Sequence, residues 1–308
     1  MRFAFFPLRF EFIAREPFFF PPGKAANTLR GALGVIFKRI ACLPHCRDAS
    51  QCDNRQSCPY AKVFEPTANG EGPSGLSDSP RPFVFRARHL DGQTIQPSQP
   101  FYFDLNVFSL DHAVLAAFVK TFAALADEGL GPGRGKADLQ SVRRLAAGSL
   151  HEETLCPATE PVFLDLAPLD SAPQRIRVEF LAPTELKHDR RVAARPEFPI
   201  LFARIRDRVA TLRRLYGEGP LDIDFQGSGL RAASVRMTRC EGRRIEATRH
   251  STRTGQSHSL GGFVGIAEYE GDLTEFLPYL EAGRWTGVGR QSVWGKGEIA
   301  IGTLPPPD

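Results

Sequence analysis

The segment GVGRQSVWGKGEIAIG, from Gly287 to Gly302, decides the fold predicted for this chain. A helical pattern over 272–282 leads into its glycine-rich part, and an alternating strand pattern closes it. The same order occurs earlier, because a helical pattern over 111–128 leads into GLGPGRGK, Gly129 to Lys136, and then into a short strand near 139–145. This internal repeat indicates two copies of one structural unit.

Each half of the chain reads as strand, helix, two strands, helix, glycine loop and strand, which is the ferredoxin-like order. The first half is expected to form strands at 2–14, 83–87, 101–108 and 139–145 and helices at 24–40 and 111–128. The second half is expected to form strands at 175–181, 263–269 and 298–302, a hairpin of 230–240 with 243–249, and helices at 197–216 and 272–282.

The predicted fold class is therefore α+β, with two tandem ferredoxin-like (RRM-like) domains. Residues 1–165 form the N-terminal domain, which carries a Cys-rich insertion at about 42–65. Residues 172–308 form the C-terminal domain, which carries the glycine-rich loop. A chain of 308 residues with 42% hydrophobic content is long and apolar enough for one or two folded domains.

The charge of the chain suits an anionic partner without proving one, since 39 Lys and Arg face 35 Asp and Glu. Its placement is more informative, because seven arginines between 231 and 253 oppose only two glutamates. This basic stripe is Arg231, Arg236, Arg239, Arg243, Arg244, Arg249 and Arg253. A solvated strand face is the alternative interpretation. The N-terminus lacks the features of a signal peptide, and no apolar run approaches the roughly 18 residues of a membrane span, which predicts a cytoplasmic protein with no membrane partner.

The glycine loops favour contact with phosphate, because glycine lets backbone amides approach an anion closely. A P-loop is excluded, since Gly297 stands where Ser or Thr is required, and a dinucleotide fingerprint fails at Ser292. An ATPase or a dehydrogenase is therefore not expected. The remaining interpretation is a loop against a polyanionic backbone, with Arg284, Arg290 and Lys296 as phosphate contacts. A tight helix-to-strand turn is the alternative.

Four of the six cysteines lie in one short segment, with three, five and five residues between them. These are Cys42, Cys46, Cys52 and Cys58. Four thiolates form a closed structural zinc site, whereas an iron-sulfur cluster is a second interpretation because Pro59 follows Cys58. The third interpretation is that these cysteines bind no metal and are free or packed in the core. Any bound metal is expected to order the insertion and to take no part in catalysis.

Several motifs occur in an order shared with one known family. They are PGKAANTLRGALG (Pro22 to Gly34), the segment from Cys42 through CPYAKVFEP, GLGPGRGK, RHSTR followed by LGGFVG, and the terminal GVGRQSVWGKGEIAI. In these motifs the chain resembles the CRISPR-associated precursor-crRNA processing endoribonucleases of the RAMP superfamily. The resemblance implies tandem ferredoxin-like domains, binding of CRISPR repeat RNA and its metal-independent cleavage to mature crRNA. The same superfamily supplies non-catalytic RNA-binding subunits of CRISPR effector complexes, and such a subunit is the alternative function. This resemblance also implies other subunits of an effector complex as partners.

Metal-independent RNA cleavage uses the substrate's 2′-hydroxyl as nucleophile and leaves a 2′,3′-cyclic phosphate, so it needs a base, an acid and a cation. Histidine, with an ordinary pKa of about 6.5, suits either proton transfer. His250 is the first candidate because it lies within the arginine stripe. His45 is the second, since it follows the first helix, where the resembled family often places a catalytic histidine. Because it lies between Cys42 and Cys46, a metal ligand or a residue without a role is the alternative interpretation. His258 is the third, in a predicted loop before Gly261.

The candidate RNA contacts come from the start of the first helix, the arginine stripe and the terminal glycine loop. They are Lys24, Arg30, Arg236, Arg239, Arg249, Arg253, Arg284, Gly287, Gly289, Arg290, Gly295, Lys296 and Gly297. For Lys24 and Arg30, solvated helix charges are the alternative interpretation.

Overall fold

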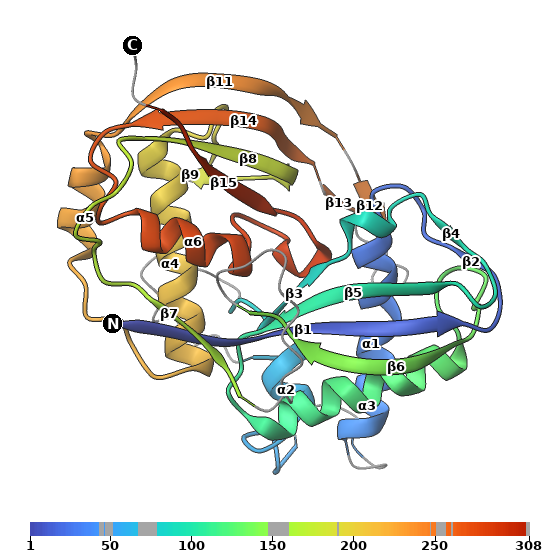
Figure 1. Cartoon of the computed structure of the whole chain (residues 1–308). Coiled ribbons are helices and arrows are strands. Elements are labelled where there is room, and N and C mark those ends of the chain that lie inside the picture. The colour runs from blue at the N-terminus through green and yellow to red at the C-terminus, as the bar shows by residue number, and fades with distance from the viewer. Residues whose placement is uncertain are drawn as a thin grey trace. The chain divides into compact units, whose positions relative to one another are not determined.

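The computed structural model describes residues 1–42, 46, 52–66, 79–146, 160–189, 191–246, 248–250, 257–259 and 261–305, with the backbone alone at 248–250 and 257–259. The chain divides into two compact units (Figure 1). The N-terminal unit comprises Ala4–Phe163 and Leu215–Gly219, and the C-terminal unit comprises Met1–Phe3, Leu164–Arg214 and Pro220–Asp308. Across the described ranges, no helix has both the length and the apolar character needed to cross a membrane.

The N-terminal unit is built on an antiparallel sheet with the strand order β3-β5-β1-β6, in which β7 also pairs with β1. Along the chain the main elements follow as β1, α1, β3, β5, α3 and β6. The bounds are β1 Arg2–Ala14, α1 Ala25–Ala41, α2 Pro59–Phe64, β3 Phe83–Arg86, the 3-10 helix η2 Arg88–Leu90, β5 Pro100–Val107, α3 His112–Glu128, β6 Ala137–Arg144 and β7 Val162–Asp165. Two short strands, β2 Phe18–Phe19 and β4 Thr94–Ile95, pair with each other.

Phenylalanine side chains form the core of this unit. On β1 the alternation of the strand pattern buries Phe10 and Phe12, and the rings of Phe10 and Phe122 on α3 lie 4.7 Å apart. The rings of Phe37 on α1 and Phe118 on α3 are 5.1 Å apart. Because each buried Phe contributes about 1.5–3 kcal/mol, these contacts stabilise the packing of both helices against the sheet.

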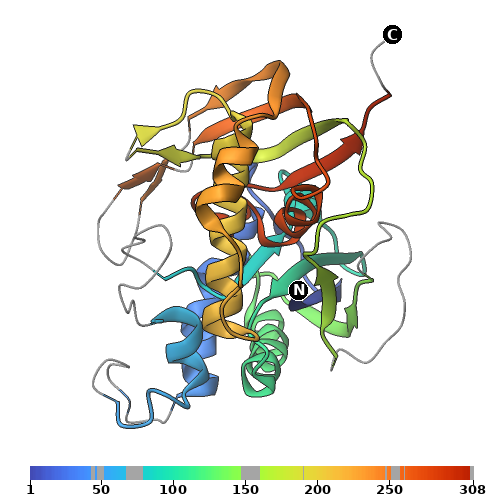
Figure 2. The same ribbon diagram turned by 90° about the vertical axis from the view of Figure 1, so that its left-hand side faces the viewer.

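The C-terminal unit repeats this plan with the strand order β11-β14-β8-β15 and the chain order β8, α4, β11, β14, α6 and β15. The bounds are β8 Arg175–Thr184, β9 Lys187–His188, β10 Arg191–Val192, α4 Phe198–Tyr216, α5 Phe225–Ala232, β11 Arg236–Ile245, β12 Thr248–His250, β13 Ser257–Ser259, β14 Gly262–Glu270, α6 Leu277–Thr286, the 3-10 helix η3 Ser292–Trp294 and β15 Ile299–Thr303. Helices α4 and α6 cover one face of the sheet (Figures 1 and 2). The rings of Phe202 and Phe276 there are 4.7 Å apart. The protein is thus an α+β protein with antiparallel sheets, as the sequence predicts.

The predicted hairpin of 230–240 with 243–249 is wrong. Residues 225–232 form α5, whose first turn is capped by the Asp224 carboxylate accepting from the Gly227 amide at 2.8 Å. Residues 236–245 form the single strand β11, in which Gly242 lies opposite Gly265 of β14. A Cβ atom at Gly242 would collide with the Val264 carbonyl oxygen, so this glycine permits close strand approach and does not mark a turn.

Helix α6 begins later than the sequence pattern predicts. Asp272 was expected at its start, but this carboxylate accepts from the Thr274 amide at 3.0 Å and from the Thr274 hydroxyl at 2.6 Å. It therefore stabilises a turn that precedes the helix, and α6 starts at Leu277.

Candidate nucleic-acid site

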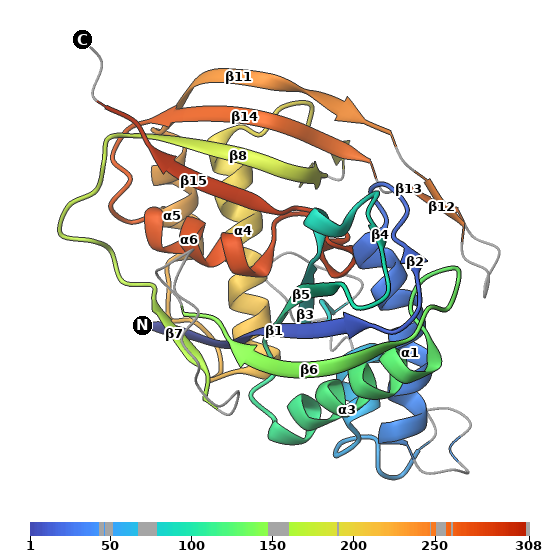
Figure 3. The ribbon, with the colours of Figure 1, turned by 45° about the vertical axis from the view of Figure 1, so that its right-hand side comes forward.

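Three segments leave the C-terminal sheet at the same end (Figure 3, right-hand side). Strand β8 ends at Thr184, which pairs with Phe263 near the start of β14. Strand β11 ends beside the same point, because Ile245 pairs with Gly262. Strand β15 begins there, since it runs antiparallel beside β8. The β9–β10 hairpin after β8, the β12–β13 hairpin after β11 and the glycine loop before β15 therefore emerge together.

The glycine loop, residues 287–297, packs onto the chain that follows β8. Gly289 has a φ of 76°, and a Cβ atom there would collide with the Glu185 carbonyl oxygen. That oxygen accepts a hydrogen bond from the Arg290 amide at 3.1 Å. The Gly297 amide donates to the Pro183 carbonyl at 3.1 Å. The loop is thus tied to residues 183–185 through two of its amides, and further loop amides, such as that of Val288, donate within the loop itself.

The three cations proposed for this loop have different surroundings. The Arg290 guanidinium is about half exposed and donates to the buried Glu185 carboxylate at 2.7 Å. Arg284 pairs with Glu281 one helical turn away at 2.6 Å. Lys296 is buried, with 8% of its surface exposed. Arg290 is therefore the loop cation with the most accessible surface for a ligand.

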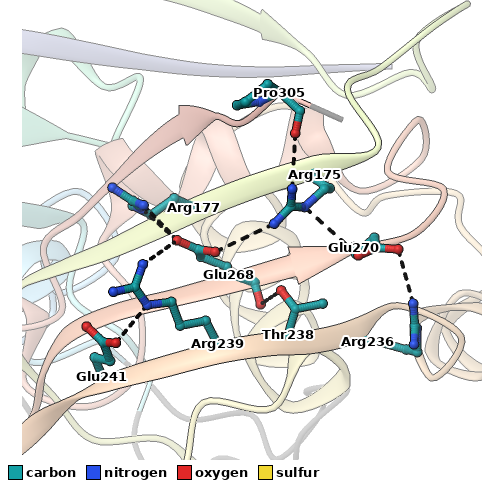
Figure 4. Close-up of polar contacts among 9 residues, drawn as sticks. All are labelled: Arg175, Arg177, Arg236, Thr238, Arg239, Glu241, Glu268, Glu270 and Pro305. Carbon is teal, nitrogen blue, oxygen red and sulfur yellow. Dashed lines mark hydrogen bonds and ion pairs between the residues drawn. The ribbon is translucent and has the colours of Figure 1, made fainter. Parts of the chain in front are cut away.

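The first part of the arginine stripe is neutralised by an ion-pair network on the exposed face of the sheet (Figure 4). Arg236 on β11 contacts Glu270 on β14 at 3.1 Å. Arg239 contacts Glu241 at 2.8 Å and the buried Glu268 at 3.5 Å. The hydrogen bond from Arg239 lowers the pKa of Glu241, which keeps this carboxylate charged at neutral pH. Arg236 and Arg239 are thus less available to phosphate than the sequence predicts.

The second part of the stripe is different. Arg243 and Arg244 are exposed, and neither forms an ion pair within the part of the chain that the structure describes. They lie opposite Val264 and Phe263 on β14, whereas Arg236 and Arg239 lie opposite acidic residues. Both arginines belong to the basic stripe seen in the sequence, but neither is among the predicted RNA contacts. The strand register is the signal that separates the two parts.

Two of the three candidate histidines lie on the β12–β13 hairpin. His250 pairs through its backbone with Ser257, and His258 lies opposite Arg249. The hairpin therefore brings both histidines and one candidate arginine to the same end of the sheet as the glycine loop. His45 and Arg253 lie outside the described residues.

The candidate cations of the N-terminal unit lie on α1. Lys24 is the exposed N-cap residue, and Arg30 is half-buried six residues further along. The first amide of the helix, at Ala25, donates to the Asp91 carboxylate at 2.8 Å. A carboxylate thus already occupies the anion-binding position at this helix terminus.

The four cysteines lie around the end of α1 and the start of α2. Cys42 directly follows α1, and Cys58 is the N-cap residue of α2. Burial and the neighbouring thiols of Cys58 and Cys46 raise the pKa of the Cys42 thiol to about 12. Three of the four thiols are therefore close together. Among the residues that the structure describes, no group of three or more His, Cys, Asp or Glu has the geometry of a metal centre.

The comparisons with known proteins match both units. Residues 178–299, which contain the glycine loop and both hairpins, match the family described as CRISPR-associated endoribonuclease Cas6. Residues 3–163 match the N-terminal domain family AF_1859_N. Residues 178–299 therefore belong to the CRISPR precursor-crRNA processing family. No curated protein matches the chain.

Solved structures of this family share the fold. The Cas6 (TTHB231) product complex, whose protein is from Thermus thermophilus, is 16% identical with a TM-score of 0.54, and the match covers 96% of this chain and 99% of that one. A second product complex, of Cas6 (TTHA0078), is 17% identical with a TM-score of 0.54, over 98% of this chain and 100% of that one. A partial Cas6-RT-Cas1–Cas2 complex is 12% identical with a TM-score of 0.51, over 97% of this chain and 46% of that one.

Proposed function

We propose that the protein is a cytoplasmic endoribonuclease that cleaves precursor crRNA within its repeat, without a catalytic metal. The match of residues 178–299 to the Cas6 endoribonuclease family carries this proposal. The arrangement of the C-terminal unit supports it, because the glycine loop, two hairpins and Arg243 and Arg244 leave the sheet at one end. Other subunits of a CRISPR effector complex are its proposed protein partners.

The proposed architecture is two ferredoxin-like domains, residues 1–165 and 172–308, with the Cys-rich insertion at about 42–65 in the first. The order β-α-β-β-α-β within each unit supports it. The strand order of the sheets also supports this architecture. In each unit the first and third main strands along the chain lie next to each other at the centre of the sheet.

In the proposed reaction, a base takes the proton of the 2′-hydroxyl and the 2′-oxygen attacks the adjacent phosphorus. The bond from phosphorus to the 5′-oxygen breaks, and an acid protonates that oxygen. The products are a 2′,3′-cyclic phosphate and a 5′-hydroxyl. His250 is the first candidate for proton transfer, followed by His45 and His258, and nearby arginines stabilise the charge on the phosphorane.

We also propose that Cys42, Cys46, Cys52 and Cys58 hold a structural zinc ion, with an iron-sulfur cluster as the alternative. The closeness of three of these thiols supports the proposal. The ion would order the insertion and take no part in the reaction.

The proposed function is tested with labelled repeat RNA in EDTA. We expect cleavage at one position, a cyclic phosphate on the upstream product, and no cleavage when the nucleotide that supplies the attacking hydroxyl is 2′-deoxy. Tight binding without cleavage would instead identify a non-catalytic RNA-binding subunit. If repeat RNA and unrelated RNA are bound and cleaved equally, both the endoribonuclease and the RNA-binding subunit are contradicted.

The same assay tests the histidines. Alanine at a histidine that transfers a proton should lower kcat by about 10²- to 10⁴-fold and leave repeat binding unchanged. His89→Ala is the control, because His89 stacks on Tyr102 in the N-terminal unit, with ring centroids 4.4 Å apart. If His250→Ala, His45→Ala and His258→Ala all cut at the wild-type rate, the histidine assignment is wrong.

A further inference from the structure

The β9–β10 hairpin carries a cluster of cations that the proposed reaction does not use. Its two strands are antiparallel, with Arg191 opposite His188. The sequence from 187 to 195 holds Lys187, Arg190, Arg191 and Arg195 against one acidic residue, and of these Arg190 lies outside the described residues. In Figure 2 the hairpin, in yellow-green, projects from the C-terminal sheet at the upper left.

Two of these cations are not neutralised. Lys187 and Arg191 are exposed, and neither forms an ion pair with a carboxylate in the described part of the chain. Arg195 is exposed and only loosely paired, since its Nε atom lies 3.9 Å from a Glu197 oxygen. This distinguishes the hairpin from the network of Figure 4, where each arginine meets a glutamate. The hairpin therefore presents net positive charge to the solvent.

The cations border a concave surface. A pocket of about 590 Å³ lies beside the hairpin and is lined by His188, Arg191, Ala193, Arg195, Glu197 and Ile200 among others. Within it the His188 Nε2 atom lies 3.3 Å from the Asp189 carboxylate. The surface thus combines a hollow with guanidinium groups, which bind phosphate in a bidentate manner.

Glu185, which precedes the β9–β10 hairpin, connects this hairpin to the glycine loop. The buried Glu185 accepts from the Arg290 amide through its carbonyl oxygen and from the Arg290 guanidinium through its carboxylate. Lys187 begins β9 only two residues later, a distance that an extended chain spans in at most about 7 Å. A strand of RNA on the glycine loop would therefore have the hairpin cations next to it.

We propose that the β9–β10 hairpin binds the phosphate backbone of the repeat RNA beside the glycine loop, through Lys187, Arg191 and Arg195. This inference rests on the proposed function, because it takes repeat RNA as the ligand. Contact with phosphates fits better than base reading, since the major groove of an RNA helix is too deep and narrow for side chains to read. The hairpin would thus add affinity that is independent of sequence.

The test is the salt dependence of repeat RNA binding by Arg191→Ala. Loss of one phosphate contact should reduce the slope of log K against log[salt] by about 0.7–0.9 and weaken binding at low salt. KM should rise while kcat at saturating RNA stays at the wild-type value, because the hairpin holds RNA and does not transfer protons. Arg191→Lys should recover most of the slope, since it keeps the charge.

Lys120→Ala is the matched control. Lys120 is an exposed cation on α3 that forms no ion pair in the described residues, so its loss removes the same charge from another surface. A wild-type slope and affinity for Arg191→Ala would overturn the inference, and so would an equal effect of Lys120→Ala. If the wild-type protein cleaves repeat RNA while Arg191→Ala binds normally, the hairpin inference fails and the proposed function stands. If the wild-type protein ignores repeat RNA, both fail.

Discussion

At the scale of single residues, Gly289 illustrates how the glycine loop is constructed. Its φ of 76° lies in the left-handed region, and its Cα packs against the Glu185 carbonyl group. This approach allows both the amide and the guanidinium of Arg290 to reach Glu185. The glycine is therefore required for packing within the protein, whereas the sequence pattern alone indicated phosphate binding.

Gly289→Ala should displace the loop. We expect the free energy of unfolding to fall by at least about 1–2 kcal/mol, the cost of a left-handed residue with a side chain, and repeat RNA to bind more weakly. Gly302→Ala is the control, because a Cβ atom at this β15 position meets nothing within 4 Å. Thermal unfolding and RNA titration measure both effects. Wild-type behaviour of Gly289→Ala would show that the loop tolerates a side chain.

At the scale of elements, the contact between α1 and α2 brings two cysteines together. The rings of Phe37 and Phe64 are 5.3 Å apart, and the Lys38 Nζ atom lies 5.7 Å from the centre of the Tyr60 ring. Because these contacts lie near the end of α1 and within α2, Cys42 and Cys58 are held close to each other. The packing of α1 against α2 thus places two cysteines of the proposed metal site near each other.

Purified protein should contain about one zinc ion per chain, and Cys58→Ser should lower both the zinc content and Tm. Cys240→Ser is the matched control, since Cys240 is a half-buried cysteine on β11, away from the cluster in sequence and in the other unit. Elemental analysis gives the zinc content. Iron together with visible absorbance would favour the cluster, and protein free of both metals would refute a metal site.

At the scale of the whole molecule, the distribution of charge matters more than its sum. The formal net charge is only +4, and the glutamates of β11 and β14 neutralise part of the arginine stripe. Among the described residues of the C-terminal unit whose contacts are known, the exposed cations without an ion pair are concentrated in β9, β10 and β11. They are Lys187, Arg191, Arg243 and Arg244. These groups lie in segments at one end of its sheet.

The double variant Arg243→Ala/Arg244→Ala should therefore reduce the salt slope of RNA binding by about 1.4–1.8, for two lost phosphate contacts. Arg236→Ala/Arg239→Ala removes the same charge and should change the slope less, because those arginines already contact carboxylates. It should lower Tm instead, since the buried Glu268 loses one of its partners. Equal slopes for the two variants would show that the ion pairs open when RNA binds.

Much of the fold was predictable because its patterns are local. The alternation of apolar residues placed β1 at Arg2–Ala14 as observed, and helical spacing placed α4 within one residue of its start. The sequence also predicts a role for the glycine-rich segment before β15, which the structure places at the same end of the sheet as the two short hairpins. The short hairpins β9–β10 and β12–β13 were not predicted, since two- or three-residue strands carry too little periodicity.

The sequence by itself determined the α+β class, the repeated order of strands and helices, and the resemblance to the precursor-crRNA processing family. Only the tertiary structure decided which arginines remain open to a ligand, that Gly242 belongs to a continuous strand, and that Glu185 holds the glycine loop. The physical reason is that these features depend on partners distant in the chain: a guanidinium is neutralised, or left free, by the residue that strand pairing places opposite it.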